Sequence, residues 1–73
     1  MTENTDFEKL EKTILEFIKN RAKQNESTTS RHIHRRFDVP VEIVEPILIS
    51  LSGKNLIKEF YDEEYQEKRY TPE

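Results

Sequence analysis

Residues Ser27–Gly53 read STTSRHIHRRFDVPVEIVEPILISLSG, and this stretch decides the fold. Ile33 and Phe37 lie four residues apart in an otherwise polar segment, the spacing of neighbours on one face of a helix. Thr28 or Thr29 can cap such a helix, because a threonine hydroxyl accepts a hydrogen bond from an unpaired amide of the first turn. The sequence therefore predicts a helix of about two turns that ends near Phe37.

A turn and a second apolar helix are predicted to follow. Asp38 interrupts the apolar spacing, and Pro40 biases Val39 towards an extended backbone. Beyond the proline, four apolar side chains share one face of a helix: Val44, Ile47, Leu48 and Leu51. Gly53 and Asn55 tolerate positive φ angles, so the helix is expected to end there.

An amphipathic helix is predicted ahead of this segment. Its apolar side chains recur at steps of three and four residues: Phe7, Leu10, Ile14, Phe17 and Ile18. The charged side chains between them are expected to face solvent: Glu8, Lys9, Glu11, Lys12, Glu16 and Lys19. Thr5 and Glu8 have the spacing of a capping box, so the helix is expected to begin near Asp6. The polar run QNEST predicts its end around Lys23.

The last segment, NLIKEFYDEEYQEKRYTPE, predicts a β-hairpin. Ile57–Tyr61 is rich in β-forming residues, DEEYQE is a polar turn, and KRYT can return as the partner strand. A two-stranded ribbon is marginally stable alone, so four side chains are expected to pack on the helices: Leu56, Ile57, Phe60 and Tyr70. The expected fold class is mainly α with a small β-hairpin, that is, α+β.

Composition limits the classes of protein to which the chain can belong. Its 73 residues are expected to form one small domain, with residues 1–5 and 72–73 as flexible ends. Cysteine is absent, and no apolar run approaches the roughly 20 residues that cross a bilayer, so a cytoplasmic protein without membrane contact is expected. The net charge of −3 gives no overall attraction to phosphate, so any binding of nucleic acid needs a local basic patch.

The stretch TTSRHIHRRFDVPVEIVEPILISLSGKNLIKEF resembles the winged helix-turn-helix domains of bacterial and archaeal transcription regulators. The apolar positions that match are Ile33, Phe37 and Val39 around the turn, Val44, Leu48 and Leu51 on the third helix, and Asn55 to Ile57 before the hairpin. With the first helix and the closing RYTPE, the resemblance covers nearly the whole chain. It implies a three-helix bundle with a two-stranded wing, and DNA binding in transcription regulation.

The segment SRHIHRRF is the basic cluster of a largely acidic chain. In the family it resembles, the second helix contacts phosphates, so these side chains are candidates for contact with double-stranded DNA. The candidate nucleic-acid-binding residues are Arg31, His34, Arg35, Arg36, Lys54 and Lys58. Two alternatives remain open: contact with an acidic protein, or ordinary surface ion pairs with Glu16, Glu42 or Glu45, each worth about 0–1 kcal/mol.

The third helix has a different chemistry. Lys, Arg, Asn and Gln do most base reading in the major groove, and none of them stands between Val41 and Ser52. One interpretation is that Ile43 and Ile49 are covered by other elements of the domain. Another is that Ile43, Ile47 or Ile49 form an exposed apolar surface that binds a protein or a second copy of the chain. The candidate protein-interaction residues are Glu42, Ile43, Glu45, Ile49 and Tyr65.

Catalytic and metal chemistry find little support in the sequence. His32 and His34 are two residues apart and diverge by about 200° on a helix, so no shared metal ion is expected; their charge at acidic pH would add to the basic cluster. The segment YDEEYQE lacks the pattern of a calcium loop. No phosphate loop or nucleophile set is evident, so we expect no enzyme activity, cofactor or small-molecule substrate.

The leading expectation is a non-enzymatic winged-helix module that binds DNA, with the basic second helix on the phosphate backbone and the third helix contributing shape. The alternative is a protein–protein interaction module, or a homodimer, that uses the apolar and acidic third helix and the wing.

Overall fold

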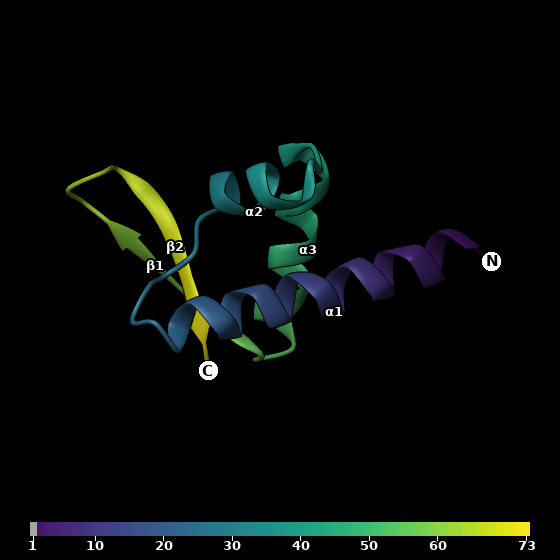
Figure 1. Ribbon diagram of the computed structural model, residues 1–73, viewed down its shortest axis with the longest axis horizontal. Helices are drawn as coiled ribbons and strands as arrows, with labels where there is room; N and C mark the ends of the chain where they lie inside the picture. Colours follow the sequence, from purple (N-terminus) through teal and green to yellow (C-terminus); the bar gives the residue numbers. More distant parts are fainter. Residues whose placement is uncertain (1) are drawn as a thin grey trace.

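The computed structural model describes the backbone of residues 2–73 and the side chains of residues 6–73. Three helices are followed by an antiparallel hairpin (Figure 1). The elements are α1 (Thr2–Ala22), α2 (Ser30–Phe37), α3 (Val41–Gly53), β1 (Ile57–Asp62) and β2 (Glu67–Pro72). The predicted class, mainly helical α+β with one hairpin, is therefore confirmed.

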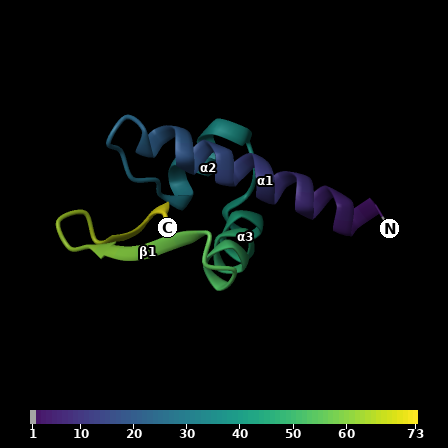
Figure 2. The ribbon, with the colours of Figure 1, turned by 90° about the horizontal axis from the view of Figure 1, so that it is seen from below.

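The long helix α1 supplies the base of the bundle, and its N-terminal part projects beyond the other elements (Figures 1 and 2). Ile14 and Ile18 are fully buried, whereas Phe7 lies in the projecting part and is exposed. The expected start near Asp6 is wrong, because the helix already begins at Thr2 and no proline or glycine precedes Asp6 to stop it. The predicted hydroxyl bond of Thr5 lies outside the described side chains.

Helix α2 begins and ends as the sequence predicts. Thr29 is its N-cap, and the Thr29 hydroxyl accepts from the amide of His32 at 3.2 Å. Asp38 ends the helix in the left-handed conformation, with a φ of 57°, and its amide donates to the carbonyl of His34. An aspartate tolerates this conformation better than most residues, so the tight turn into α3 needs no glycine.

Helix α3 begins directly after Pro40, as predicted, and continues through Pro46. Pro46 has no amide to donate to the carbonyl of Glu42, but Glu42 is an exposed residue, where water can take the place of that bond. Asn55, with a φ of 61°, turns the chain out of the helix into β1.

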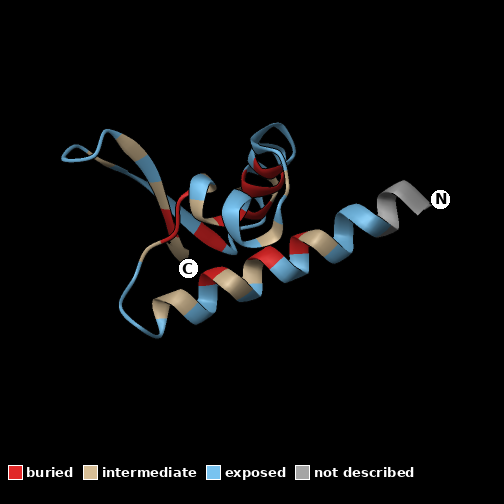
Figure 3. Cartoon of the chain, turned by 45° about the horizontal axis from the view of Figure 1, so that its top comes forward, coloured by how far each residue is buried: buried red, intermediate tan, exposed pale blue. Residues whose placement is uncertain are grey.

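The core lies where α1, α2, α3 and the base of the hairpin meet, as the buried residues of Figure 3 show. Its apolar members are Ile14, Ile18, Ile33, Val44, Ile47, Leu48, Leu51, Ile57 and Tyr70. Phe17 and Phe37 pack edge to face beside it, with their ring centroids 5.3 Å apart. All four inward positions predicted for the third helix are buried.

The hairpin pairs Ile57 with Pro72 at its base and Asp62 with Glu67 at its tip. The predicted packing of four hairpin side chains is half right. Ile57 and Tyr70 are buried, but Leu56 and Phe60 are exposed. Successive side chains of a strand point to opposite faces, so burying Ile57 turns Phe60 outward.

A short bridge ties the hairpin to the segment between α1 and α2. Thr28 and Tyr70 exchange two backbone hydrogen bonds, of 3.0 and 2.8 Å. The sequence offered Thr28 only as a possible helix cap, and the structure gives the cap to Thr29 instead. At the C-terminal end, which was expected to be flexible, Pro72 of β2 pairs with Ile57 of β1, and the amide of Glu73 donates to the carbonyl of Leu56.

Candidate functional site

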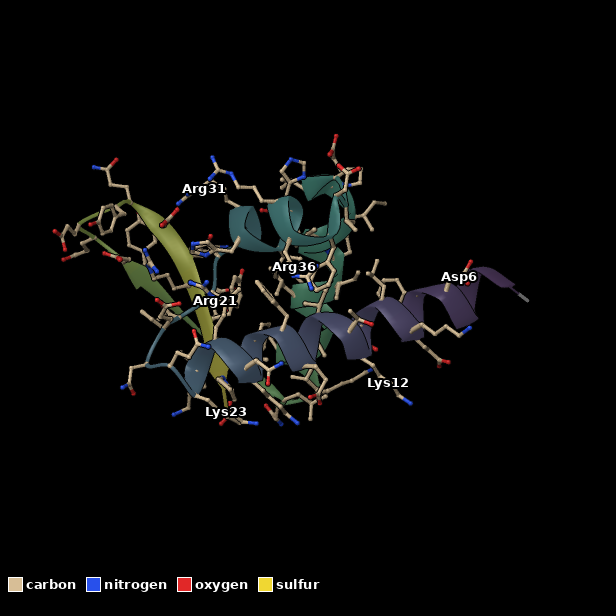
Figure 4. All side chains as sticks on the ribbon, viewed as in Figure 1. Asp6, Lys12, Arg21, Lys23, Arg31 and Arg36 are labelled. Atoms are coloured by element: carbon tan, nitrogen blue, oxygen red, sulfur yellow. The ribbon has the colours of Figure 1, made fainter. Side chains whose placement is uncertain are left out.

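The arginines of α2 divide between two sides of the helix (Figure 4). Arg31 and Arg35 are one turn apart and exposed on one side, and Arg31 points away from α1. Arg36 lies between α2 and α1, with its guanidinium 5.1 Å from the centre of the Phe37 ring. The three predicted phosphate contacts therefore do not share one face.

The two lysines expected to extend the basic patch lie elsewhere. Lys54 follows the C-terminal end of α3, roughly 20 Å along that helix from the turn after α2. Its ammonium pairs with the carboxylate of Glu11 at 2.9 Å. Lys58 is exposed on β1. The structure thus separates Lys54 from the arginines of α2.

Glu11 was predicted to face solvent, but it is only 6% exposed. The hydroxyl of Ser50 and the ammonium of Lys54 both donate to its carboxylate, and this bonding joins α1 to α3. The Ser50 bond, helped by Lys54 and opposed by burial, lowers the pKa of Glu11. Glu11 therefore acts as a buried ionic link between helices.

The ionic partner of Arg31 is Glu67 on β2, at 3.0 Å, and not the predicted Glu16, Glu42 or Glu45. Glu67 also accepts from Arg69 at 3.1 Å, and Arg69 donates in addition to Asp62 and to the hydroxyl of Ser27. This network fastens the hairpin to α2 and to the loop before it. Arg31 is consequently a partly neutralised cation.

The two histidines have different surroundings. Nδ1 of His34 donates to the carbonyl of Val39 at 2.7 Å and so braces the turn between α2 and α3. Nδ1 of His32 accepts from the amide of Thr29 at 3.1 Å. Burial lowers the pKa of His32, and the charges of Arg21, Arg31 and Arg69 lower it further against a smaller opposing effect of Glu67. His32 therefore adds positive charge to the basic cluster only at a lower pH than an ordinary histidine would.

The outer face of α3 is apolar and acidic. Ile49 is 70% exposed and Ile43 is 46% exposed, so the interpretation that other elements cover them is wrong. Glu42 and Glu45 are exposed beside them. Within residues 6–73 neither carboxylate is part of an ion pair. We call the exposed face formed by Glu42, Ile43, Glu45, Pro46 and Ile49 the α3 strip.

The hairpin borders the α3 strip on one side. Burial raises the pKa of Tyr70 to about 12, and the charge and hydrogen bond of Glu59 and the charge of Glu45 act in the same direction. The Tyr70 hydroxyl lies 3.4 Å from the carboxylate of Glu59. Glu59 on β1 thus lies beside the phenol, and the charge of Glu45 on α3 acts on the same group. Lys68 lies 3.9 Å from Glu59 and offsets part of that charge.

Tyr65 does not belong to this surface. It is exposed at the hairpin tip, far from α3 in Figures 1 and 2, with the guanidinium of Arg69 5.6 Å from its ring centre. Asp62 stabilises the tip by accepting from the amides of Glu64 and Tyr65.

The described residues offer little for a small-molecule site or a metal site. An open hollow of about 460 Å³ is lined by charged residues: Glu8, Lys9, Glu11, Lys12 and Lys54. Small-molecule sites are mostly apolar and enclosed, so this lining is unlike them. In the described part of the chain, no three metal-ligating side chains gather as a metal site would require, and no described helix has the length and apolar character to cross a membrane.

Three comparisons, with protein families, with curated proteins and with solved structures, find no match for this chain.

Proposed function

We propose that the chain is a non-enzymatic winged-helix domain that binds another protein through the α3 strip. The order of the elements supports the fold assignment: a long helix, a two-turn helix, a tight turn, a third helix and a hairpin. In the fold that this order resembles, α3 occupies the place of the helix that enters the major groove. The exposed side chains of α3 therefore indicate whether the partner is DNA or a protein.

One observation carries the proposal: the α3 strip exposes Ile43 and Ile49 next to two carboxylates that form no ion pair with any side chain of residues 6–73. Exposed apolar side chains grouped on one face are typical of surfaces that bind protein. Carboxylates on the same face repel phosphates, and the attachment of proteins to nucleic acid depends on cations. The chemistry of the strip favours a protein over a duplex.

Binding to double-stranded DNA is the second candidate, in the transcription-regulating role that the resemblance implies. The observation that favours it is the surface of α2, where Arg35 is exposed and makes no ion pair with any side chain of residues 6–73. Arg31 lies one turn away and is only partly neutralised by Glu67. These cations would hold phosphates, with no base read by α3.

A photoreactive amino acid placed at position 49, in cells that make the protein, tests the first candidate. We expect a discrete covalent adduct with another protein, and we expect it to disappear when Glu42→Arg and Glu45→Arg are introduced. The matched control carries the same photoreactive residue at the exposed position Lys12, which lies on α1 outside the strip.

Titration of a labelled mixed-sequence duplex at low salt tests the second candidate. If DNA binding is the function, the wild type retains the duplex, retention falls steeply with salt, and Arg35→Ala with Arg36→Ala abolishes it. Such retention, together with no adduct at position 49, would overturn the proposal of protein binding.

A further inference from the structure

We propose that the partner of the α3 strip is a cationic amphipathic helix, whose apolar ridge covers Ile43 and Ile49 and whose flanking Lys or Arg side chains pair with Glu42, Glu45 and Glu59. This inference rests on the proposed function and adds the chemistry of the partner. It follows from the shape, the charge and the borders of the strip.

The shape of the strip is that of one side of a helix. Glu42, Pro46 and Ile49 lie along one line at the helical spacing, opposite the buried face of α3. Side chains along such a line form a ridge flanked by grooves, the surface on which a second helix packs. Backbone donors and acceptors within α3 are largely used by the helix itself, so a partner must be recognised through side chains.

Two neighbouring elements set the borders of the strip. Ser50 donates to Glu11, so the flank of α3 that carries Ser50 and Ile43 faces α1. α3 also packs against β1, and the charge of Glu45 acts on the pKa of Tyr70 in β2, so the opposite flank faces the hairpin. A partner laid along α3 would therefore lie between α1 and β1, with its own flanks near both.

Charge complementarity selects the sign of the partner. Most of the cations that form ion pairs lie away from the strip: Arg31 and Arg69 share Glu67, and Lys54 pairs with Glu11. On the strip itself, Glu42 and Glu45 have no partner among the described side chains. On the hairpin, Lys68 lies 3.9 Å from Glu59 and offsets part of its charge, so the surplus of negative charge left for a cationic partner is mainly that of Glu42 and Glu45.

Two synthetic helical peptides test this inference directly. Both carry the same leucine ridge, and one has lysine and the other glutamate at the flanking positions. Each is titrated into the isotopically labelled full chain, and amide chemical shifts are recorded. We expect the lysine peptide to bind and to shift the amides of α3 and β1, and the glutamate peptide to leave the spectrum unchanged.

Matched variants locate the binding. Ile49→Ser and the pair Glu42→Gln with Glu45→Gln should each weaken binding of the lysine peptide about tenfold. The control pair is Glu63→Gln with Glu64→Gln, which makes the same change in net charge at the hairpin tip and should leave binding unchanged. All five positions are exposed, and thermal unfolding of each variant checks that the fold survives.

Several outcomes would overturn the inference. Equal binding of both peptides would show that charge does not select the partner. If the control pair weakened binding of the lysine peptide as much as Glu42→Gln with Glu45→Gln does, the peptide would be attracted by net charge and not by the α3 strip. A change from dimer to monomer in Ile49→Ser would identify the occupant as a second copy of the chain. A protein adduct at position 49 together with no binding of the lysine peptide would refute the cationic helix and leave the proposed function standing.

Discussion

The imidazole of His32 accepts a hydrogen bond from the backbone amide of Thr29, while the hydroxyl of Thr29 accepts from the amide of His32. These reciprocal bonds form a capping box in which histidine takes the place of the usual glutamate or glutamine. Nδ1 can accept only while it carries no proton. The first turn of α2 therefore depends on a neutral imidazole.

This dependence predicts that the protein loses stability as the pH falls below about 6.5. Burial and three nearby arginines hold the pKa of His32 in the folded state below its ordinary value. Between the two pKa values the unfolded chain binds more protons than the folded chain, so the free energy of unfolding decreases as the pH is lowered. Urea unfolding at a series of pH values measures the slope. His32→Gln keeps an acceptor at the same position without titrating, so its slope should be smaller; an unchanged slope would contradict this role of His32.

The link between Glu11, Ser50 and Lys54 predicts that replacing Glu11 destabilises the protein, although the sequence pattern places Glu11 in solvent. Glu11→Ala should lower the free energy of unfolding by about 1.5–3 kcal/mol, because hydrogen bonds to a charged group are lost in a buried place. Glu16→Ala on the same helix, at an exposed position, should change it by less than about 0.5 kcal/mol. Equal losses in chemical denaturation would count against the link.

Glu11 should also contribute to acid sensitivity at lower pH than His32. Its pKa in the folded state is lowered, chiefly by the Ser50 hydroxyl. The stability it contributes is therefore present above about 4.5 and disappears as the pH falls through the folded pKa. In Glu11→Gln the free energy of unfolding should depend less steeply on pH below about 4.5. Its decrease at higher pH, which is due to His32, should remain. A steep acid limb retained in that variant would disprove the contribution.

Two isoleucines on opposite faces of α3 give a matched pair. Ile47 is fully buried, and Ile47→Ala should cost about 2–5 kcal/mol of unfolding free energy. Ile49 is exposed, and Ile49→Ala should change that free energy by less than about 0.5 kcal/mol. Thermal or urea unfolding compares the two variants. Comparable losses would mean that Ile49 is covered in solution, and the α3 strip would then be occupied within the free protein or by a second copy.

The hairpin should loosen when Arg69 is replaced. Arg69→Met removes the bonds to Asp62, Glu67 and Ser27 that hold β2 to its surroundings. Amide hydrogen exchange at Thr28 and Tyr70, which bond each other, should accelerate by about tenfold or more. Lys68→Met is the control, since Lys68 is exposed and makes one long ion pair. Equal acceleration of exchange in both variants would show that Arg69 does not hold β2 in place.

The elements of the fold were predictable because their signals are local. Apolar spacing indicated each helix, Thr29 and Asp38 indicated the ends of α2, and the polar run after Tyr61 indicated the hairpin turn. The start of α1 was missed because a capping pattern does not stop a helix when the residues before it are compatible with helical structure.

The arrangement of the candidate site depended on residues far apart in the chain. Glu11 and Ser50 are separated by 39 positions, and Arg31 and Glu67 by 36, so no local spacing announces either pair. A charged residue at a helical position that looks solvent-facing is buried only when another element brings it a partner. Conversely, the sequence left open whether Ile49 is covered or exposed, because the pattern of α3 alone does not say how much of this helix α1 and the hairpin cover.

The hairpin has one further consequence. Along the side of β1 that faces away from β2, the described residues supply no neighbouring strand, so backbone groups there are open to pairing with another chain. An open edge of this kind is a template for aggregation, and charges along it are a common defence. Lys58 and Glu59, exposed in the middle of β1, place opposite charges on that edge. Two valines at these positions would remove both charges from the edge, and edge-to-edge pairing of the ribbon would then meet less resistance.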